Sequence, residues 1–353
     1  MTVPTSHGRR SMDGSVLARL IEASGLFNRG LSAQAGALGG RFPALVQRNI
    51  FLEFELAKEA IPGGFGLGFE AGQLDYFKIV LDPFLDSAQG RSLQAALIDD
   101  PFAADHHQHL NLQIDGDPDW VEFDVSDGCI DTTPFVFFRI PSRFGVIASL
   151  ADVHELCAIL PGQAMESDFS KLLGRIVALG PARPYRIGVA RSRGPGWWRP
   201  ILTNLSLRQV EAALAGLTPG NFDSLLGPVA RLYDRAMDSP GACFALSIDV
   251  QDDRITAVDV ECPYLFRIVE PAARAGPTRA YTDELTAAGL ISEQTATWIR
   301  HNVLRTIGLD GVNSTLRIML HHLKFRLYGQ PRPRVKAYLL LDLAERPGRG
   351  ARR

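Results

Sequence analysis

The sequence has 353 residues, a length that fits one large domain or two domains of average size. Hydrophobic residues make up 46% of it and charged residues 22%, as in ordinary globular proteins, which excludes a disordered chain or a fibrous rod. Lys and Arg number 37 against 39 Asp and Glu, so overall charge gives no reason to expect nucleic-acid binding. Every apolar run is far shorter than the roughly 20 residues that cross a bilayer, so we expect no membrane span and a cytoplasmic protein.

The first elements change from helical to strand periodicity. After a leader over residues 1–14 that we expect to be disordered, Ser15–Phe27 places apolar residues at helical spacing. In Phe51–Leu56 apolar residues alternate with Glu53 and Glu55, which is typical of a strand with one apolar and one polar face.

The same alternation recurs later in pairs. His109–Asp115 and Val121–Ser126 predict one hairpin, with a turn at Gly116–Asp119, and Phe244–Val250 with Val258–Cys262 predict another. Because short turns join antiparallel neighbours, the pattern favours an antiparallel sheet over a doubly wound parallel one.

Stretches with helical spacing separate these strands. They are Ser87–Ile98, Leu150–Leu179, Leu207–Met237 and Thr282–Tyr328. The helices would cover the apolar faces of the strands, and the polar faces must contact water, either outside an open sheet or inside a closed barrel. We expect one domain over residues 15–344 and a disordered basic tail over residues 345–353.

Two conspicuous motifs predict no chemistry of their own. The glycine-rich run Gly63–Gly68 lacks the spacing of a dinucleotide site and predicts a turn. His106, His107 and His109 form a cluster that a solvated loop explains, and we assign no metal to it.

Cationic residues and tyrosines recur inside strand-like segments. They are Tyr76 and Lys78, Arg139, Tyr185 and Arg186, Arg267, and Lys336 and Tyr338. Residues two apart in a strand project from the same face, so several such strands side by side would present Lys, Arg and Tyr together. That set suits a diphosphate, because Lys and Arg neutralise its charge and Tyr hydroxyls donate hydrogen bonds. For any single residue, the ordinary polarity of an exposed strand is the alternative interpretation.

The motifs Tyr76-x-Lys78, His321–Arg326 and Lys336-Ala337-Tyr338 resemble the aromatic prenyltransferases of the ABBA type. The resemblance implies an α+β fold in which repeated helix-strand-strand-helix units close an antiparallel β-barrel with the helices outside. It also implies a prenyltransferase of natural-product biosynthesis. Such an enzyme moves an isoprenyl group from an allylic diphosphate to an electron-rich aromatic small molecule or a peptide side chain. Dimethylallyl is the isoprenyl group that we expect.

The resemblance further implies roles for residues in the barrel lumen. Lys78, Arg139, Arg186, Lys324 and Lys336 would bind the diphosphate, and Tyr76, Tyr185 and Tyr338 would shield the allyl cation. Glu53, Glu55 or Glu70 would orient the acceptor or take its proton, with a solvated strand glutamate as the alternative for each.

The sequence requires no cofactor and leaves open whether Mg²⁺ accompanies the diphosphate. The competing hypotheses are a non-catalytic barrel that binds a hydrophobic or anionic small molecule, and a partner protein in a biosynthetic assembly.

Overall fold

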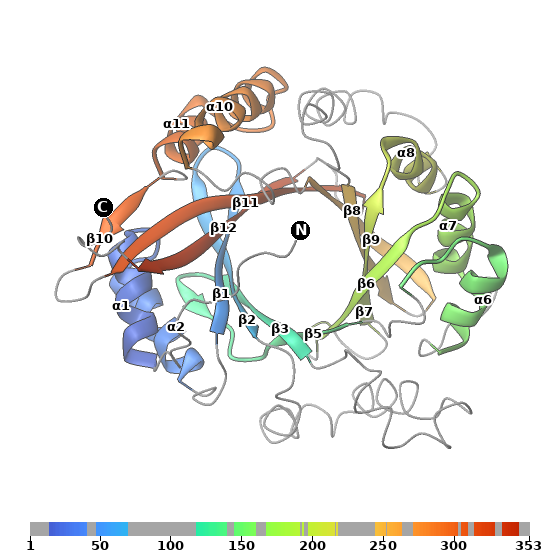
Figure 1. Ribbon diagram of the computed structural model, residues 1–353, viewed down its shortest axis with the longest axis horizontal. Helices are drawn as coiled ribbons and strands as arrows, with labels where there is room; N and C mark the ends of the chain where they lie inside the picture. Colours follow the sequence, from blue (N-terminus) through green and yellow to red (C-terminus); the bar gives the residue numbers. More distant parts are fainter. Residues whose placement is uncertain are drawn as a thin grey trace, which may run out of the picture.

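A computed structural model describes residues 14–40, 47–69, 118–139, 145–159, 167–190, 193, 197–215, 217, 244–251, 253–262, 271–302, 305–309, 314–328 and 334–345. Within these ranges the strands form one antiparallel sheet that closes on itself, and the helices surround it (Figure 1). The expected antiparallel barrel with outer helices is confirmed.

Ten strands make the ring of the barrel, in the order β11-β12-β1-β2-β3-β5-β6-β7-β8-β9, and β9 pairs with β11 to close it. Their bounds are β1 (Gln47–Leu56), β2 (Ala60–Phe69), β3 (Pro118–Ser126), β5 (Phe135–Arg139), β6 (Arg183–Ala190), β7 (Trp197–Leu205), β8 (Phe244–Gln251), β9 (Arg254–Cys262), β11 (Ser314–Tyr328) and β12 (Arg334–Glu345). Two short strands lie outside the ring: β4 (Cys129–Ile130) pairs with β3, and β10 (Thr306–Gly308) pairs with β11.

The described helices lie in groups around this ring (Figure 1). They are α1 (Gly14–Ser24), α2 (Arg29–Gly39), α6 (Leu150–Ile159), α7 (Asp168–Val177), α8 (Leu207–Ala215), α10 (Pro271–Ala287) and α11 (Glu293–Asn302). None of these helices is both long enough and apolar enough to cross a bilayer.

Local sequence explains where the helices begin and which face they bury. The Asn28 side chain accepts a hydrogen bond from the Leu31 amide at 2.9 Å and caps α2, and Ser167 caps α7 in the same way at 3.2 Å. In α7 the buried residues Phe169, Leu172 and Ile176 recur at helical spacing. The apolar stripe therefore faces the barrel.

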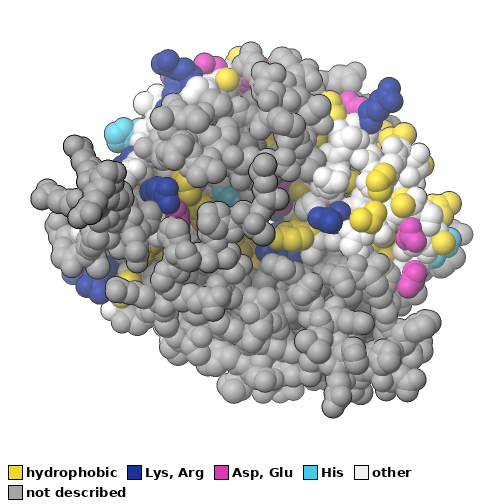
Figure 2. Space-filling model, viewed as in Figure 1, with side chains coloured by type: hydrophobic (Ala, Val, Ile, Leu, Met, Phe, Trp, Pro, Cys, Tyr) yellow, Lys and Arg dark blue, Asp and Glu magenta, His cyan; other side chains and the backbone are white. Residues whose placement is uncertain are grey.

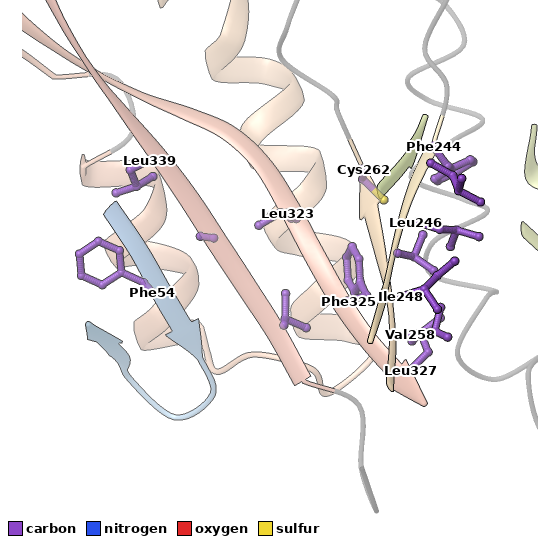
Figure 3. Packing of buried hydrophobic residues seen from close by; sticks show 14 of the residues in the cluster. Phe54, Phe244, Leu246, Ile248, Val258, Cys262, Leu323, Phe325, Leu327 and Leu339 are labelled. Carbon is purple, nitrogen blue, oxygen red and sulfur yellow. The ribbon is translucent and has the colours of Figure 1, made fainter. Parts of the chain in front are cut away.

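Each strand has one face in the core between barrel and helices and one face toward the lumen. Phe54 on β1 packs on Phe27 and on Trp298 of α11, with ring centroids 6.0 and 4.8 Å away. Figure 3 shows Leu246 and Ile248 projecting from one side of the β8–β9 hairpin. The residues between these apolar positions point into the lumen, because successive side chains of a strand alternate in direction.

The structure confirms the hairpin predicted from Phe244–Val250 and Val258–Cys262, which is formed by β8 and β9. Val121–Ser126 lies in β3 as expected, but within the described residues β3 pairs with β2, β4 and β5, and His109–Asp115 lies outside them. The turn predicted over Gly63–Gly68 is wrong, because this run is part of β2.

The predicted helices are confirmed only in part. Leu150–Leu179 contains α6 and α7, and α8 begins at Leu207. The helical prediction over Thr282–Tyr328 holds for α10 and α11 and is wrong for Ser314–Tyr328, which forms the long strand β11. Ser87–Ile98 lies outside the described residues.

Candidate functional site

The lumen has an apolar lining of its own, separate from the outer core. Its buried members are Phe51, Trp120, Phe135, Phe137, Ala190, Trp197 and Tyr338, which come from six different strands. The Phe51 and Trp120 ring centroids lie 4.4 Å apart, and those of Phe135 and Trp197 lie 5.3 Å apart. Aromatic faces therefore line much of the described lumen.

Glu53 lies at the centre of a cluster formed by β1 and β12. These strands pair so that Glu53 faces Tyr338 and Glu55 faces Lys336. Lys336 Nζ lies 2.5 Å from Glu53 Oε1 and 3.1 Å from Glu55 Oε1, and the Tyr338 hydroxyl donates a hydrogen bond to Glu53 Oε2. This geometry brings together four of the residues predicted from the sequence.

The electrostatics of this cluster favour the ionised form of Glu53. Burial alone would raise the pKa of Glu53, but the charge and hydrogen bond of Lys336 and the Tyr338 hydroxyl outweigh it and lower the pKa to about 2. Burial would lower the pKa of Lys336, and the two carboxylates raise it instead. Burial and the Glu53 charge raise the pKa of Tyr338. Glu53 is therefore a carboxylate, and Tyr338 is a neutral phenol.

The lumen face of β7, β8, β9 and β11 carries alternating charges. The Arg199 guanidinium donates to Asp249 at 2.5 and 3.1 Å, and Arg326 donates to Asp259 at 2.6 and 2.9 Å. Arg326 Nη2 also lies 3.4 Å from Asp249 Oδ2, which joins the two pairs. This is a continuous ionic network within the barrel wall.

Lys324 extends the network toward Glu261. Its Nζ lies 3.2 Å from Glu261 Oε1 and 3.5 Å from Asp259 Oδ2, and it donates to the Ser247 hydroxyl at 3.2 Å. Ser247 in turn donates to Glu261 at 2.5 Å. Burial would raise the pKa of Asp259, but Lys324 and Arg326 outweigh it and lower that pKa. We call Arg199, Asp249, Asp259, Glu261, Lys324 and Arg326 the charge-paired wall.

Two histidines connect the wall to the Glu53 cluster. The His322 ring stacks on Tyr338 with centroids 4.2 Å apart, and its Nδ1 lies 2.8 Å from Nδ1 of His321. Burial lowers the pKa of His322 to about 4 and Lys324 adds to the effect, against the opposing charge of Glu261 and Glu53. The ring is therefore neutral at neutral pH, and it can either donate or accept a hydrogen bond.

A pocket opens between β1, β2 and β3. It is small and is lined by Phe51, Glu53, Gly64, Phe65, Gly66, Trp120, Glu122, Phe123, Asp124 and Tyr338. Trp120 Nε1 donates to Glu122 Oε1 at 2.8 Å. Burial raises the pKa of Glu122, as does the nearby Glu53 carboxylate, although Lys324, Arg199 and the Trp120 hydrogen bond act in the other direction. The pocket thus contains three carboxyl groups, and the pKa values of two of them, Glu53 and Glu122, are shifted in opposite directions.

The remaining predicted residues lie in different places. The Arg186 guanidinium lies 4.3 Å from the centroid of the Tyr185 ring and 5.7 Å from that of Trp120. The backbone of Arg139 pairs with Arg186 between β5 and β6. Glu70, Tyr76 and Lys78 lie outside the described residues.

Sequence reasoning missed most of the charge-paired wall and the second carboxyl of the pocket. Asp249, Asp259 and Glu261 occupy the polar positions of the predicted β8–β9 hairpin, and Glu122 occupies one in β3. Their alternation with apolar residues was the available signal. It places each side chain on a polar face, but it does not say which strands become neighbours.

Basic and aromatic side chains lie together in the described part of the lumen. Among the described residues, no group of three or more His, Cys, Asp or Glu side chains is placed to hold a metal. In Figure 2, basic and hydrophobic side chains lie next to one another near the centre of the view, where Figure 1 looks along the barrel. Mixed charge and aromatic surface is the chemical character of the site.

Comparisons with solved structures identify the fold. The protein is similar to 6-dimethylallyltryptophan synthase from Micromonospora olivasterospora, solved with DMASPP and Trp, with a TM-score of 0.54 and 15% identity over 93% of this chain and 95% of that one. It is similar to the prenyltransferase PriB, with a TM-score of 0.55 and 12% identity over 94% and 96% of the two chains. A further 6-dimethylallyl tryptophan synthase gives a TM-score of 0.58 and 16% identity over 95% and 97%.

No protein-family model and no curated protein matches this sequence. The likeness therefore lies in the arrangement of the chain rather than in its residues. The protein has the fold of the ABBA-type aromatic prenyltransferases over nearly its whole length.

Proposed function

We propose that this protein transfers an isoprenyl group from its diphosphate to an electron-rich aromatic acceptor inside the barrel. Dimethylallyl is the isoprenyl group that we expect. The observation that carries this proposal is the buried Glu53–Lys336–Tyr338 cluster in the lumen of a barrel shared with dimethylallyltryptophan synthases. An indole or phenol is the acceptor class that we expect, and an aromatic peptide side chain is the alternative.

Lumenal cations would hold the leaving group. Lys324, Lys336 and Arg186, with Arg199 and Arg326 beside them, supply the positive charge that a departing diphosphate needs. Because Lys324 and Lys336 already contact carboxylates, the diphosphate would have to replace those partners as it binds. The C–O bond of the donor then breaks, and its electron pair leaves with the diphosphate.

Aromatic faces would protect the allyl cation formed in that step. Tyr338, Phe51 and Trp120 lie together beside the pocket, and π faces stabilise cations. A lumen that excludes bulk water also prevents capture of the cation by hydrolysis. The acceptor carbon attacks the cation, forms the new C–C bond and then loses its proton.

Glu53 would act at the acceptor end. As a buried carboxylate it accepts a hydrogen bond from an acceptor N–H or O–H, and this holds the ring in position and increases its electron density. Glu55 is half-buried and contacts Lys336, which favours a supporting role for it.

The direct test is mass spectrometry of purified protein incubated with dimethylallyl diphosphate and a panel of indoles, phenols and aromatic peptides. We expect a prenylated product from at least one acceptor, and a repeat with EDTA tests whether Mg²⁺ is needed. The Glu53→Gln variant should lower turnover while leaving diphosphate binding nearly unchanged. An equal loss of both would give Glu53 a purely structural role.

The second candidate is a non-catalytic barrel that binds a small molecule. It is favoured by one observation: Lys324, Lys336, Arg199 and Arg326 all have carboxylate partners within the lumen. A protein that binds isoprenyl diphosphate but transfers the group to no acceptor and not to water would support this candidate and contradict the first.

A further inference from the structure

A bulge in β11 brings two adjacent histidines to the lumen. The pairing of β11 with β12 shifts between Leu320 and His322, so His321 is the extra residue of the bulge. The His321 ring lies 4.7 Å from that of Phe51, and the His322 ring stacks on Tyr338, both of which belong to the lumen lining. In a regular strand one of the two histidines would point into the outer core. We call His321 and His322 the histidine pair.

A hydrogen bond joins the two rings through their Nδ1 atoms, which lie 2.8 Å apart. One Nδ1 donates its hydrogen and the other accepts it. When His322 is the donor, its Nε2 carries a lone pair and can accept a proton. His321 then fixes the tautomer and the orientation of the His322 ring. The histidine pair thus has the arrangement of a base and the group that orients it.

The surroundings of His322 keep its ring neutral and would stabilise it once protonated. Burial lowers the pKa of His322, Glu261 of β9 and Glu53 of β1 raise it, and Lys324 of β11 lowers it, with a result of about 4. At neutral pH the ring is therefore unprotonated. Both rings of the histidine pair are only partly buried, so a molecule in the lumen can contact them.

Glu53 is less suited than His322 to take a proton. Lys336 donates to its Oε1 and the Tyr338 hydroxyl donates to its Oε2, so both carboxylate oxygens already accept hydrogen bonds. The His322 ring lies 4.2 Å from that of Tyr338, on the same side of the barrel wall. The geometry therefore separates a carboxylate that orients the acceptor from a neighbouring base that can deprotonate it.

We propose that His322 Nε2 takes the proton that the acceptor ring loses after its new C–C bond has formed, with His321 as the positioning residue. This inference rests on the proposed function, because it assigns the last step of that reaction. The ring C–H bond breaks, its electron pair restores the aromatic ring, and the proton binds Nε2. The imidazolium keeps its Nδ1–H bond to His321 and later gives the proton to solvent. A weak base is sufficient, because a ring that has lost its aromaticity is strongly acidic.

The test compares ordinary and ring-deuterated acceptor in transfer assays with dimethylallyl diphosphate. The acceptor is the one that the wild-type protein prenylates fastest in the panel of indoles, phenols and aromatic peptides. Wild-type protein should transfer to both forms at the same rate, because proton loss to a positioned base is fast. His322→Gln has no basic nitrogen, so its turnover should fall about tenfold or more, and the ordinary form should react about twofold faster than the deuterated one.

Two further variants control for other effects of the substitution. His301→Gln, at an exposed position of α11, should match the wild-type protein in turnover and isotope effect. His321→Gln keeps the base but changes its partner, so it should lose less turnover than His322→Gln. An unchanged rate for His321→Gln would contradict the positioning role. His322→Asn also lacks a basic nitrogen, and it replaces His322→Gln in the test if that variant does not fold.

The possible results separate this inference from the proposed function. If the wild-type protein prenylates an acceptor and the folded His322 variants show the same rate, the inference alone fails. A lower rate without an isotope effect would also overturn it, because His322 would then have a structural role. If the wild-type protein prenylates no acceptor, the proposed function fails and the inference fails with it.

Discussion

The two halves of the lumen wall differ in how their buried charges are paired. On β7, β8, β9 and β11, three cations face three carboxylates, and each charge has a partner. On β1, β2 and β3, Trp120 and Glu53 pack over Gly64 and Gly66, and Glu122 has no ion pair among the described residues. The charges of the first half are paired with one another, and the carboxyl group of Glu122 in the second half is not.

This difference separates structural charges from charges available for binding. A buried ion pair loses its hydration, so it is stable only where geometry and further hydrogen bonds compensate. The charge-paired wall meets that condition with paired guanidinium and carboxylate groups. A ligand therefore gains most by contacting the side where compensation is missing.

Breaking the charge-paired wall should give the largest effect. Asp259 is 1% exposed and contacts both Lys324 and Arg326. Asp259→Asn leaves two cations short of a partner and should lower the free energy of unfolding by about 3 to 5 kcal/mol, measured by urea denaturation. As the control, Asp342→Asn removes a half-exposed partner of Arg317 and should cost less than about 1 kcal/mol. Similar costs for the two variants would mean that the wall is not a structural network.

Removing a cation from the Glu53 cluster should affect turnover next. If Lys336 stabilises the departing diphosphate, Lys336→Ala loses about 2 to 4 kcal/mol of transition-state stabilisation, or roughly a hundredfold or more in rate. Single-turnover transfer of the dimethylallyl group measures it. Lys171→Ala, at an exposed position of α7, is the control and should keep the parent rate. A folded Lys336→Ala protein with the parent rate would refute the role.

Adding a side chain at Gly66 of β2 should have a smaller effect on stability. Gly66→Ala forces the Trp120 ring to move and should cost about 1 to 3 kcal/mol, measured by thermal unfolding. Gly276→Ala provides the control, because nothing lies within 4 Å of a Cβ at this exposed position of α10. There the change should raise stability by roughly 0.5 to 1 kcal/mol. Unchanged stability of Gly66→Ala would contradict the close packing of Trp120 against Gly66.

The smallest effect concerns the pH dependence that His322 adds between the two halves. Its pKa of about 4 in the folded protein lies below the ordinary histidine value of 6.5, so the unfolded chain binds this proton first as the pH falls. The stability it contributes is complete above pH 6.5 and is lost as the pH falls toward 4. Between pH 7 and 5.5 the loss should be about 1 kcal/mol.

Denaturant unfolding of His322→Gln checks this pH dependence. The variant should lose about 1 kcal/mol less than the parent protein over the same pH interval. Parallel pH profiles for the two proteins would show that His322 does not titrate in this way.

Period-two alternation predicted much of the barrel because one face of each strand is apolar. Phe244–Val250 and Val258–Cys262 show it clearly, and they form the β8–β9 hairpin. It could not give the order of strands around the ring, since pairing depends on contacts between distant segments. The alternation could therefore not predict which cations contact Asp249 and Asp259.

A bulge in β11 gives its leucines the spacing expected of a helix. Its register shifts between Leu320 and His322, so Leu316 and Leu320 before the shift lie on the same face as Leu323 and Leu327 after it. The spacing of these four leucines is four, three and four, which is also the spacing of a helix face. The bulge in β11 thus produces an apolar pattern that also fits an α-helix.

Sequence reasoning missed the position of Gly64 and Gly66 inside a strand for a different reason. A run such as Gly63–Gly68 is typical of a turn, and no local rule places it inside a strand. Only the tertiary fit of Trp120 and Glu53 against β2 makes glycine necessary there. Glu53, Lys336 and Tyr338, in contrast, were within reach of sequence reasoning because residues i and i+2 of a strand share a face.

The position of β12 in the ring has a consequence for synthesis. β12 is the last described strand along the chain, yet it lies between β11 and β1 and carries Lys336 and Tyr338. Until it leaves the ribosome, β1 and β11 both expose strand edges, and such edges pair readily with other chains. Contacts between such distant segments also form slowly. We therefore expect these edges to stay exposed until β12 closes the barrel and completes the Glu53 cluster in the same step.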